Sequence, residues 1–95
     1  MDFDLNRAAF QEELIGLEKG ELLAFFKTLR KLKALSWEQV YRNRGLRWES
    51  IKSVEADAYT IRVTQKCRAV VKREGDILRF LSLHPDHDSA YKKRR

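Results

Sequence analysis

The sequence lacks several features that mark common protein classes. Its single cysteine, Cys67, can form neither an internal disulfide nor a thiolate zinc site, which excludes a disulfide-stapled secreted domain. Its apolar runs are far too short to span a bilayer. The first residues show no basic run followed by an apolar core, the pattern of a signal peptide. We therefore expect a soluble, cytoplasmic protein that needs no membrane.

Charge is what the sequence has in quantity. Charged residues make up 36% of the 95 residues, and the net charge is +6. A small basic protein attracts polyanions, which include nucleic acid, acidic membrane and acidic protein partners, and charge alone does not choose among them. Hydrophobic residues make up 43%, enough for a core, and no linker or repeat divides the chain. We expect one domain over residues 1–95.

The first half of the chain has helical periodicity. Apolar spacing predicts helices over 7–17, 21–35 and 37–44. Asn6 is the expected N-cap of the first helix, Gly20 the expected break before the second, and Ser36 the expected cap of the third. The opening "DFDL" (2–5) fits a second interpretation as well, a short edge strand that leads into the first helix.

The second half alternates with a period of two. Strands are predicted over 47–54, 58–65, 67–74 and 77–84. The links between them are short, and Gly75–Asp76 is a tight hairpin signal, so we expect an antiparallel meander. The fold class is therefore α+β, with two to three N-terminal helices packed on a twisted, mainly antiparallel four-stranded sheet. One sheet face takes the helices, and the other is expected to be an open face that carries Arg62 and Arg68.

Both histidines lie near the end of the sequence, in "LSLHPDHDSAYKKRR" (81–95). One interpretation is a metal site of His84, His87 and Asp88. A metal needs about three ligands in fixed geometry, the chain has neither a cysteine pair nor a third histidine, and the surrounding charge is positive. We accordingly expect no metal and no cofactor. Two further interpretations of this C-terminal segment stay open: an acid–base site on a basic surface, and a solvated tail.

An acid–base site on a basic face suits RNA cleavage through the 2′-hydroxyl. Such cleavage needs one group to take the 2′-OH proton, another to protonate the leaving 5′-oxygen, and cations to stabilise the charged phosphorane. Arg62 and Arg68 could clamp the phosphate, although two strand arginines also fit an ordinary solvated face. Candidates for moving protons or contacting a base are Glu49, His84, His87 and Tyr91. Cys67, Trp37 and Trp48 are interpreted as packing residues.

The strand motifs carry a resemblance. The segments "YTIRV" (59–63), "CRAVV" (67–71), "ILRFLSL" (77–83) and "HPDHDSAY" (84–91) resemble the RelE/ParE superfamily of toxins from bacterial toxin–antitoxin systems. The resemblance implies a compact α+β fold and a cognate antitoxin as partner. For RelE-type members it implies metal-independent cleavage of ribosome-associated mRNA, the activity of an mRNA interferase. For ParE-type members it implies inhibition of DNA gyrase without catalysis.

The resemblance also implies roles for single residues. Arg62 matches a basic position on the middle strand, Arg68 matches the arginine that contacts the scissile phosphate, and Glu49 matches a general base. His84 and His87 lie where the family places a general acid or a phosphate-binding cation, and Tyr91 matches a terminal tyrosine. The cationic run that follows adds non-specific affinity for nucleic acid and comprises Lys92, Lys93, Arg94 and Arg95. Cys67 departs from the family, which has an aromatic residue there.

Overall fold

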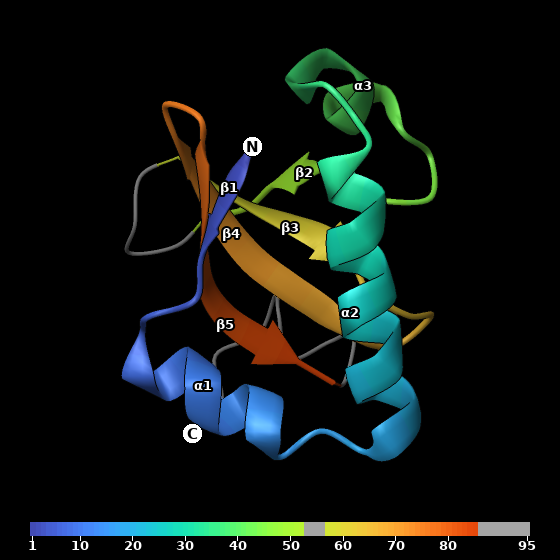
Figure 1. Ribbon diagram of the computed structural model, residues 1–95, viewed down its shortest axis with the longest axis vertical. Helices are drawn as coiled ribbons and strands as arrows, with labels where there is room; N and C mark the ends of the chain where they lie inside the picture. The colour runs from blue at the N-terminus through green and yellow to red at the C-terminus, as the bar shows by residue number, and fades with distance from the viewer. Residues whose placement is uncertain (53–56, 86–95) are drawn as a thin grey trace.

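Helices and one sheet form the molecule (Figure 1), in a computed structural model that describes residues 1–52 and 57–85. In chain order the elements are β1 (Asp2–Asp4), α1 (Ala8–Ile15), α2 (Lys19–Lys33), α3 (Trp37–Arg42), β2 (Glu49–Ser50), β3 (Ala58–Arg62), β4 (Arg68–Glu74) and β5 (Ile77–His84). The predicted α+β order is confirmed, and the opening stretch is a strand. No helix in the described ranges is long and apolar enough to cross a membrane.

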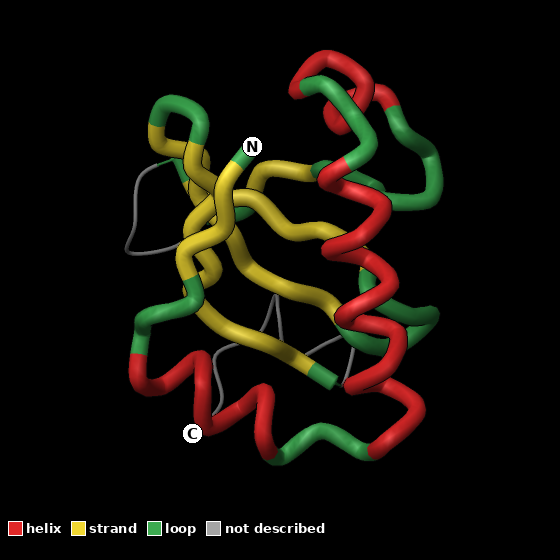
Figure 2. Tube along the Cα trace, viewed as in Figure 1, coloured by secondary structure: helices red, strands yellow, loops and turns green. Residues whose placement is uncertain are grey.

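The five strands are ordered β1-β5-β4-β3-β2 (Figure 2). Strands β2 to β5 form the expected antiparallel meander, while β1 pairs in parallel with β5. The sheet is therefore mixed and has one strand more than the four predicted. Three strands are shorter than predicted, β4 by a single residue and β2 and β3 by more. Arg47 has a φ of 51°, outside the β region, so β2 begins only after it. A turn follows Arg62, in which the Thr64 hydroxyl accepts from the Cys67 amide at 2.9 Å.

The helix ends differ from the prediction by up to two residues, and two expected boundary residues have other positions. Arg7, not Asn6, is the N-cap of α1. Gly20 lies inside the first turn of α2 rather than at a break, because the first helical turn tolerates residues of low propensity when the amphipathic stripe behind it packs. The predicted cap of α3 is confirmed as a capping box. The Ser36 hydroxyl accepts from the Gln39 amide at 3.2 Å, and the Gln39 side chain accepts from the Ser36 amide at 2.9 Å.

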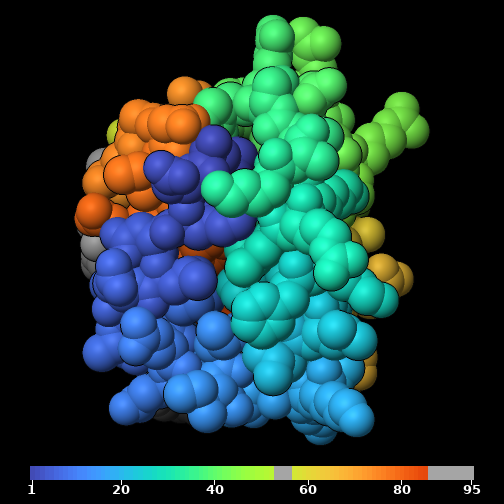
Figure 3. Space-filling view, in the orientation of Figure 1, coloured from blue at the N-terminus to red at the C-terminus, as the bar shows by residue number. Residues whose placement is uncertain are grey.

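The main core lies between α1, α2 and one face of the sheet. Three fully buried rings meet there from three elements, and their centroids are separated by 5.4 Å for Phe10–Phe80, 5.5 Å for Phe25–Phe80 and 5.8 Å for Phe10–Phe25. Each such side chain contributes about 2–3 kcal/mol by leaving water. Phe3 of β1 meets Phe80 edge-on at 6.0 Å, which explains why so short a strand is held in the sheet. Figure 3 shows α1 and α2 side by side over this face.

The opposite sheet face has a small apolar centre of its own. Ala58, Val70 and Leu81 are buried together, and Ile51 packs against them. The expectation of an open, arginine-bearing face is therefore wrong in one respect, since its middle is apolar. Val70 follows Arg68 by two residues and so shares its face, and the bulge at this point brings Leu81 of β5 to the same side.

Candidate functional site

The strand register brings two arginines and a histidine into one row. Arg62 of β3 lies opposite Arg68 of β4, and Arg68 in turn lies opposite His84 of β5. Directly opposed residues project from the same sheet face, with Cβ atoms about 5 Å apart. The three side chains thus form a short line across three neighbouring strands, on the face away from the helices. We call this line the Arg–Arg–His row.

The members of the row differ in their exposure. Arg68 is only 2% exposed, whereas Arg62 and His84 are half-buried. The Nε atom of Arg62 is itself buried and has no hydrogen-bond partner in the described part of the chain. A guanidinium group in this state is costly, because a buried donor without an acceptor loses its hydration without replacement. An anion that approaches the row would meet Arg62 and His84 first and Arg68 beneath them.

His84 is held as a neutral imidazole near neutral pH. Burial lowers the pKa of His84 below its ordinary value of 6.5, and the nearby Glu13 carboxylate opposes this shift only in part. The Nε2 atom of His84 lies 2.9 Å from the Ser82 hydroxyl on the same strand. The Glu13 carboxylate also accepts from the Leu83 amide at 2.9 Å, which fixes α1 against this end of β5. A neutral imidazole can accept a proton.

Glu49 lies on the same face as the row, one residue pair further along. It is opposite Thr60 on β3, and Thr60 is two residues from Arg62 and projects to the same side. Its carboxylate forms an ion pair with Arg47, with 3.1 Å between Oε2 and Nη2. The structure thus brings Glu49 near the row without placing it in the row.

The remaining predicted site residues lie outside the described residues. They are His87, Tyr91, Lys92, Lys93, Arg94 and Arg95, together with Asp88 of the metal interpretation. Within 1–52 and 57–85, no group of three or more histidine, cysteine, aspartate or glutamate side chains could hold a metal ion. Cys67 is buried in the main core, where burial and then the charge of Glu21 raise the pKa of its thiol to about 12. The interpretation of Cys67 as a packing residue is confirmed.

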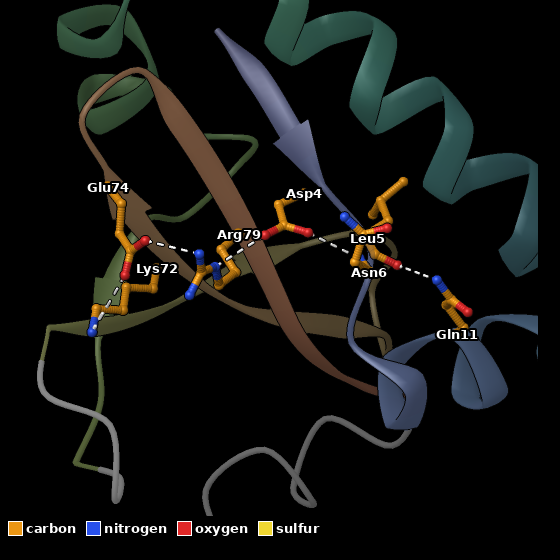
Figure 4. A network of polar contacts seen from close by, with 7 residues as sticks. All are labelled: Asp4, Leu5, Asn6, Gln11, Lys72, Glu74 and Arg79. Atoms are coloured by element: carbon orange, nitrogen blue, oxygen red, sulfur yellow. Dashed lines mark hydrogen bonds and ion pairs between the residues drawn. The ribbon is translucent and has the colours of Figure 1, made fainter.

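The far end of the same face carries balanced charge (Figure 4). Arg79 bridges β1 and β4, because its Nε lies 3.1 Å from Asp4 and its Nη2 lies 3.0 Å from Glu74. Lys72 lies 3.8 Å from the other oxygen of Glu74. These cations are matched by carboxylates and tie the edge strand to the sheet.

Sequence reasoning missed a set of aromatic side chains on the helix side of the sheet. The rings of Tyr41, Trp48 and Tyr59 are neighbours, and Arg73 donates from Nη1 to the Tyr41 hydroxyl at 2.7 Å. These residues come from α3, the loop before β2, β3 and β4. The only signal in the sequence is the density of aromatic and arginine residues in "YRNRGLRW" (41–48).

The element order, the five-stranded mixed sheet and the helices on one of its faces define an α+β fold of the RelE type. A copper-bound mutant toxin from Helicobacter pylori has this fold, with a TM-score of 0.58 and 19% identity over 96% of this chain and 99% of that chain. The DinJ–YafQ complex of Escherichia coli contains another such chain, with a TM-score of 0.58 and 16% identity over 96% of this chain and 98% of that chain. The sequence matches no protein-family model, and no curated protein matches it.

Proposed function

We propose that this protein is the toxin of a toxin–antitoxin system and that it is an endoribonuclease that cleaves ribosome-associated mRNA without a metal ion. The observation that carries the proposal is the Arg–Arg–His row, which places two guanidinium groups and a neutral imidazole side by side on one sheet face. The similarity of fold to a toxin from Helicobacter pylori and to a chain of the DinJ–YafQ complex supports the choice of class.

The chemistry follows from the row. Arg62 and Arg68 lie directly opposite each other on one sheet face, so their two guanidinium groups are suited to two-point binding of a phosphodiester. As the 2′-oxygen attacks phosphorus, negative charge grows on the phosphoryl oxygens, and the two arginines stabilise it. The 2′-oxygen–phosphorus bond forms and the bond to the 5′-oxygen breaks, which leaves a 2′,3′-cyclic phosphate and a 5′-hydroxyl.

The two proton transfers have separate candidates. His84, whose pKa is lowered, takes the proton of the 2′-hydroxyl, and Glu49 is the other acceptor on this face. This assignment moves His84 from the donor role expected from its sequence position to an acceptor role. His87 and Tyr91 are the proposed donors to the leaving 5′-oxygen. A cognate antitoxin is the proposed protein partner, and its charge should complement the basic toxin.

The proposal is tested with purified protein, an end-labelled mRNA, ribosomes and a chelator. We expect cleavage that needs ribosomes, persists in the chelator and leaves 5′-hydroxyl ends. The His84→Gln variant should lose most of the rate, about a hundredfold for a general base, whereas the matched control Arg30→Gln on the exposed face of α2 should retain it. Folded wild-type protein that cuts no mRNA would contradict the proposal, and would leave the non-catalytic alternative of an inhibitor that docks on a protein such as gyrase.

A further inference from the structure

A cavity of about 390 Å³ lies on the helix side of the sheet, lined by Tyr41, Trp48, Asp57, Tyr59 and Arg73. Tyr59 lies opposite Val71 of the main core, and Arg73 follows Val71 by two residues, so both project toward the helices. The Arg–Arg–His row projects from the other face. The cavity is therefore separate from the candidate active site.

Aromatic rings form the walls of this cavity. Trp48 stacks on Tyr59 with 4.7 Å between centroids and 24° between planes, and Tyr41 lies 5.1 Å from Trp48 at 52°. The Trp37 ring extends this aromatic cluster, with 6.3 Å between its centroid and that of Tyr41. Tyr41 nevertheless remains 42% exposed. The cluster thus presents ring surface to solvent instead of burying it all.

Two charged groups of opposite sign complete the lining. The guanidinium carbon of Arg73 lies 4.1 Å from the centre of the Trp37 ring, and its Nε donates to the Gly75 carbonyl at 2.7 Å. With the bond to Tyr41, two of its five N–H donors are used and its orientation is fixed. Asp57 precedes β3 with a φ of 61°, and its carboxylate makes no hydrogen bond or ion pair in the described ranges. The cavity lining therefore combines an acceptor with no partner among the described residues and a donor of fixed orientation.

These features match one chemical class of ligand. A nucleotide has a planar base that stacks on aromatic rings, amino groups that donate to a carboxylate, and a phosphate that an arginine binds. In the sequence, three arginines separate Tyr41 from Trp48, and one of them, Arg44, is exposed with no ion pair to a described residue. Bases within a duplex cannot reach such a cavity, so the strand must be unpaired.

We propose that this cavity is a base-binding site for single-stranded RNA in which one unpaired base stacks on Tyr41 and Trp48. Asp57 accepts from the amino group of the base, so cytosine binds better than uracil, which has no amino group. Arg73 and Arg44 hold the flanking phosphates. The proposal goes beyond cleavage, since the site would anchor an RNA strand whether or not the Arg–Arg–His row cuts it.

The test measures the binding of labelled oligonucleotides to the full chain by fluorescence anisotropy. A short 2′-O-methyl cytidine oligomer is the probe, because it lacks the nucleophile and cannot be cleaved. We expect Tyr41→Ala to weaken binding about tenfold. Tyr41→Phe should weaken it less, since the ring stays and only the hydrogen bond that orients Arg73 is lost. The matched control is Phe26→Ala, which removes a ring of 50% exposure from α2 and should change affinity less than about twofold.

A second variant tests the acceptor. Asp57→Asn should reduce the preference for the cytidine oligomer over the matching uridine oligomer. Three results would each overturn the proposal. Tyr41→Ala and Phe26→Ala could lose affinity equally, the protein could bind a duplex as tightly as the single strand, or the folded wild-type protein could fail to bind the oligomer. If the wild-type protein fails to bind, the exposed rings would instead be candidates for contact with a protein partner. Because the probe cannot be cut, these outcomes do not depend on whether the protein is a nuclease.

Discussion

The substitution Arg62→Met should make the protein more stable and inactive. The Nε atom of Arg62 is buried without a hydrogen-bond partner in the described chain, a state that costs about 1 kcal/mol or more. Arg68 lies directly opposite, and two unit charges about 6 Å apart repel by about 3 kcal/mol at an effective dielectric constant of about 20. Solvent at the half-buried Arg62 screens most of this repulsion, to about 1 kcal/mol.

Methionine keeps the apolar stem of the arginine and removes both costs. We therefore expect the free energy of unfolding to rise by about 1–2 kcal/mol, and the thermal midpoint to rise by about 5 °C or more for a domain of this size. Differential scanning calorimetry gives the midpoint, and the mRNA cleavage assay gives the activity.

Inorganic phosphate supplies the second readout. If the row binds phosphate, wild-type protein gains about 1.4 kcal/mol at roughly ten times the dissociation constant, while Arg62→Met gains little. The control Arg30→Met changes an exposed arginine of α2 and should respond to phosphate as the wild type does. A lower midpoint for Arg62→Met, or equal phosphate shifts in all three proteins, would refute the reasoning.

Three further predictions follow from other parts of the fold. Because the pKa of His84 is lowered in the folded state, its contribution to the free energy of unfolding is fully present above pH 6.5 and is lost as the pH falls through the folded pKa. Urea titrations at several pH values should show this loss in the wild type and less of it in His84→Gln. The Cys67 thiol, with a pKa raised to about 12, should react with a thiol reagent only as fast as the protein unfolds, so labelling at the rate of a free peptide thiol would be contrary to the structure. Gly20→Ala should raise the free energy of unfolding by about 0.5 kcal/mol, because a Cβ there meets nothing within 4 Å. Gly75→Ala, at a φ of 63°, should lower it by about 1 kcal/mol. Equal effects of the two substitutions in chemical denaturation would contradict this prediction.

Local signals in the sequence predict much of this fold. The Ser36 capping box, the Gly75–Asp76 hairpin and the alternation along β3 to β5 each depend on neighbouring residues, and the structure confirms all three. The edge strand β1 is harder to predict, because three residues show no reliable periodicity and its pairing with β5 joins distant parts of the chain. The early end of β3 depends on the side chain of Thr64 and not on a change in hydrophobic pattern.

The Arg–Arg–His row shows why a site is harder to predict than a fold. Arg62 and Arg68 could be assigned to one face from alternation alone. Counting back from the hairpin in an uninterrupted ladder places Leu83, not His84, opposite Arg68. The bulge between Val70 and Val71 shifts the register by one residue and brings His84 into the row. A bulge leaves no clear mark in a sequence, so the histidine could be proposed as a candidate but not placed.

The aromatic cavity was missed because its parts meet only in the folded chain. Arg73 and Tyr41 are 32 residues apart, and Trp37 and Trp48 look like ordinary packing residues in the sequence. Both tryptophans do pack against the main core, so that interpretation is confirmed. Which part of each ring stays accessible is a property of the tertiary structure and cannot be read from the sequence.

The most direct test of the central claim is induced expression of wild type and Arg68→Lys in a bacterium, with primer extension on an abundant transcript. Arg68 is only 2% exposed, and lysine keeps its charge, so Arg68→Lys disturbs folding less than Arg68→Ala would. Lysine lacks the planar guanidinium group, so the substitution removes two-point contact with a phosphate. We predict growth arrest and new mRNA 5′ ends with wild type, neither with Arg68→Lys, and both with Arg30→Lys. New ends of equal intensity with soluble Arg68→Lys protein, or arrest by wild type without any new ends, would contradict the account.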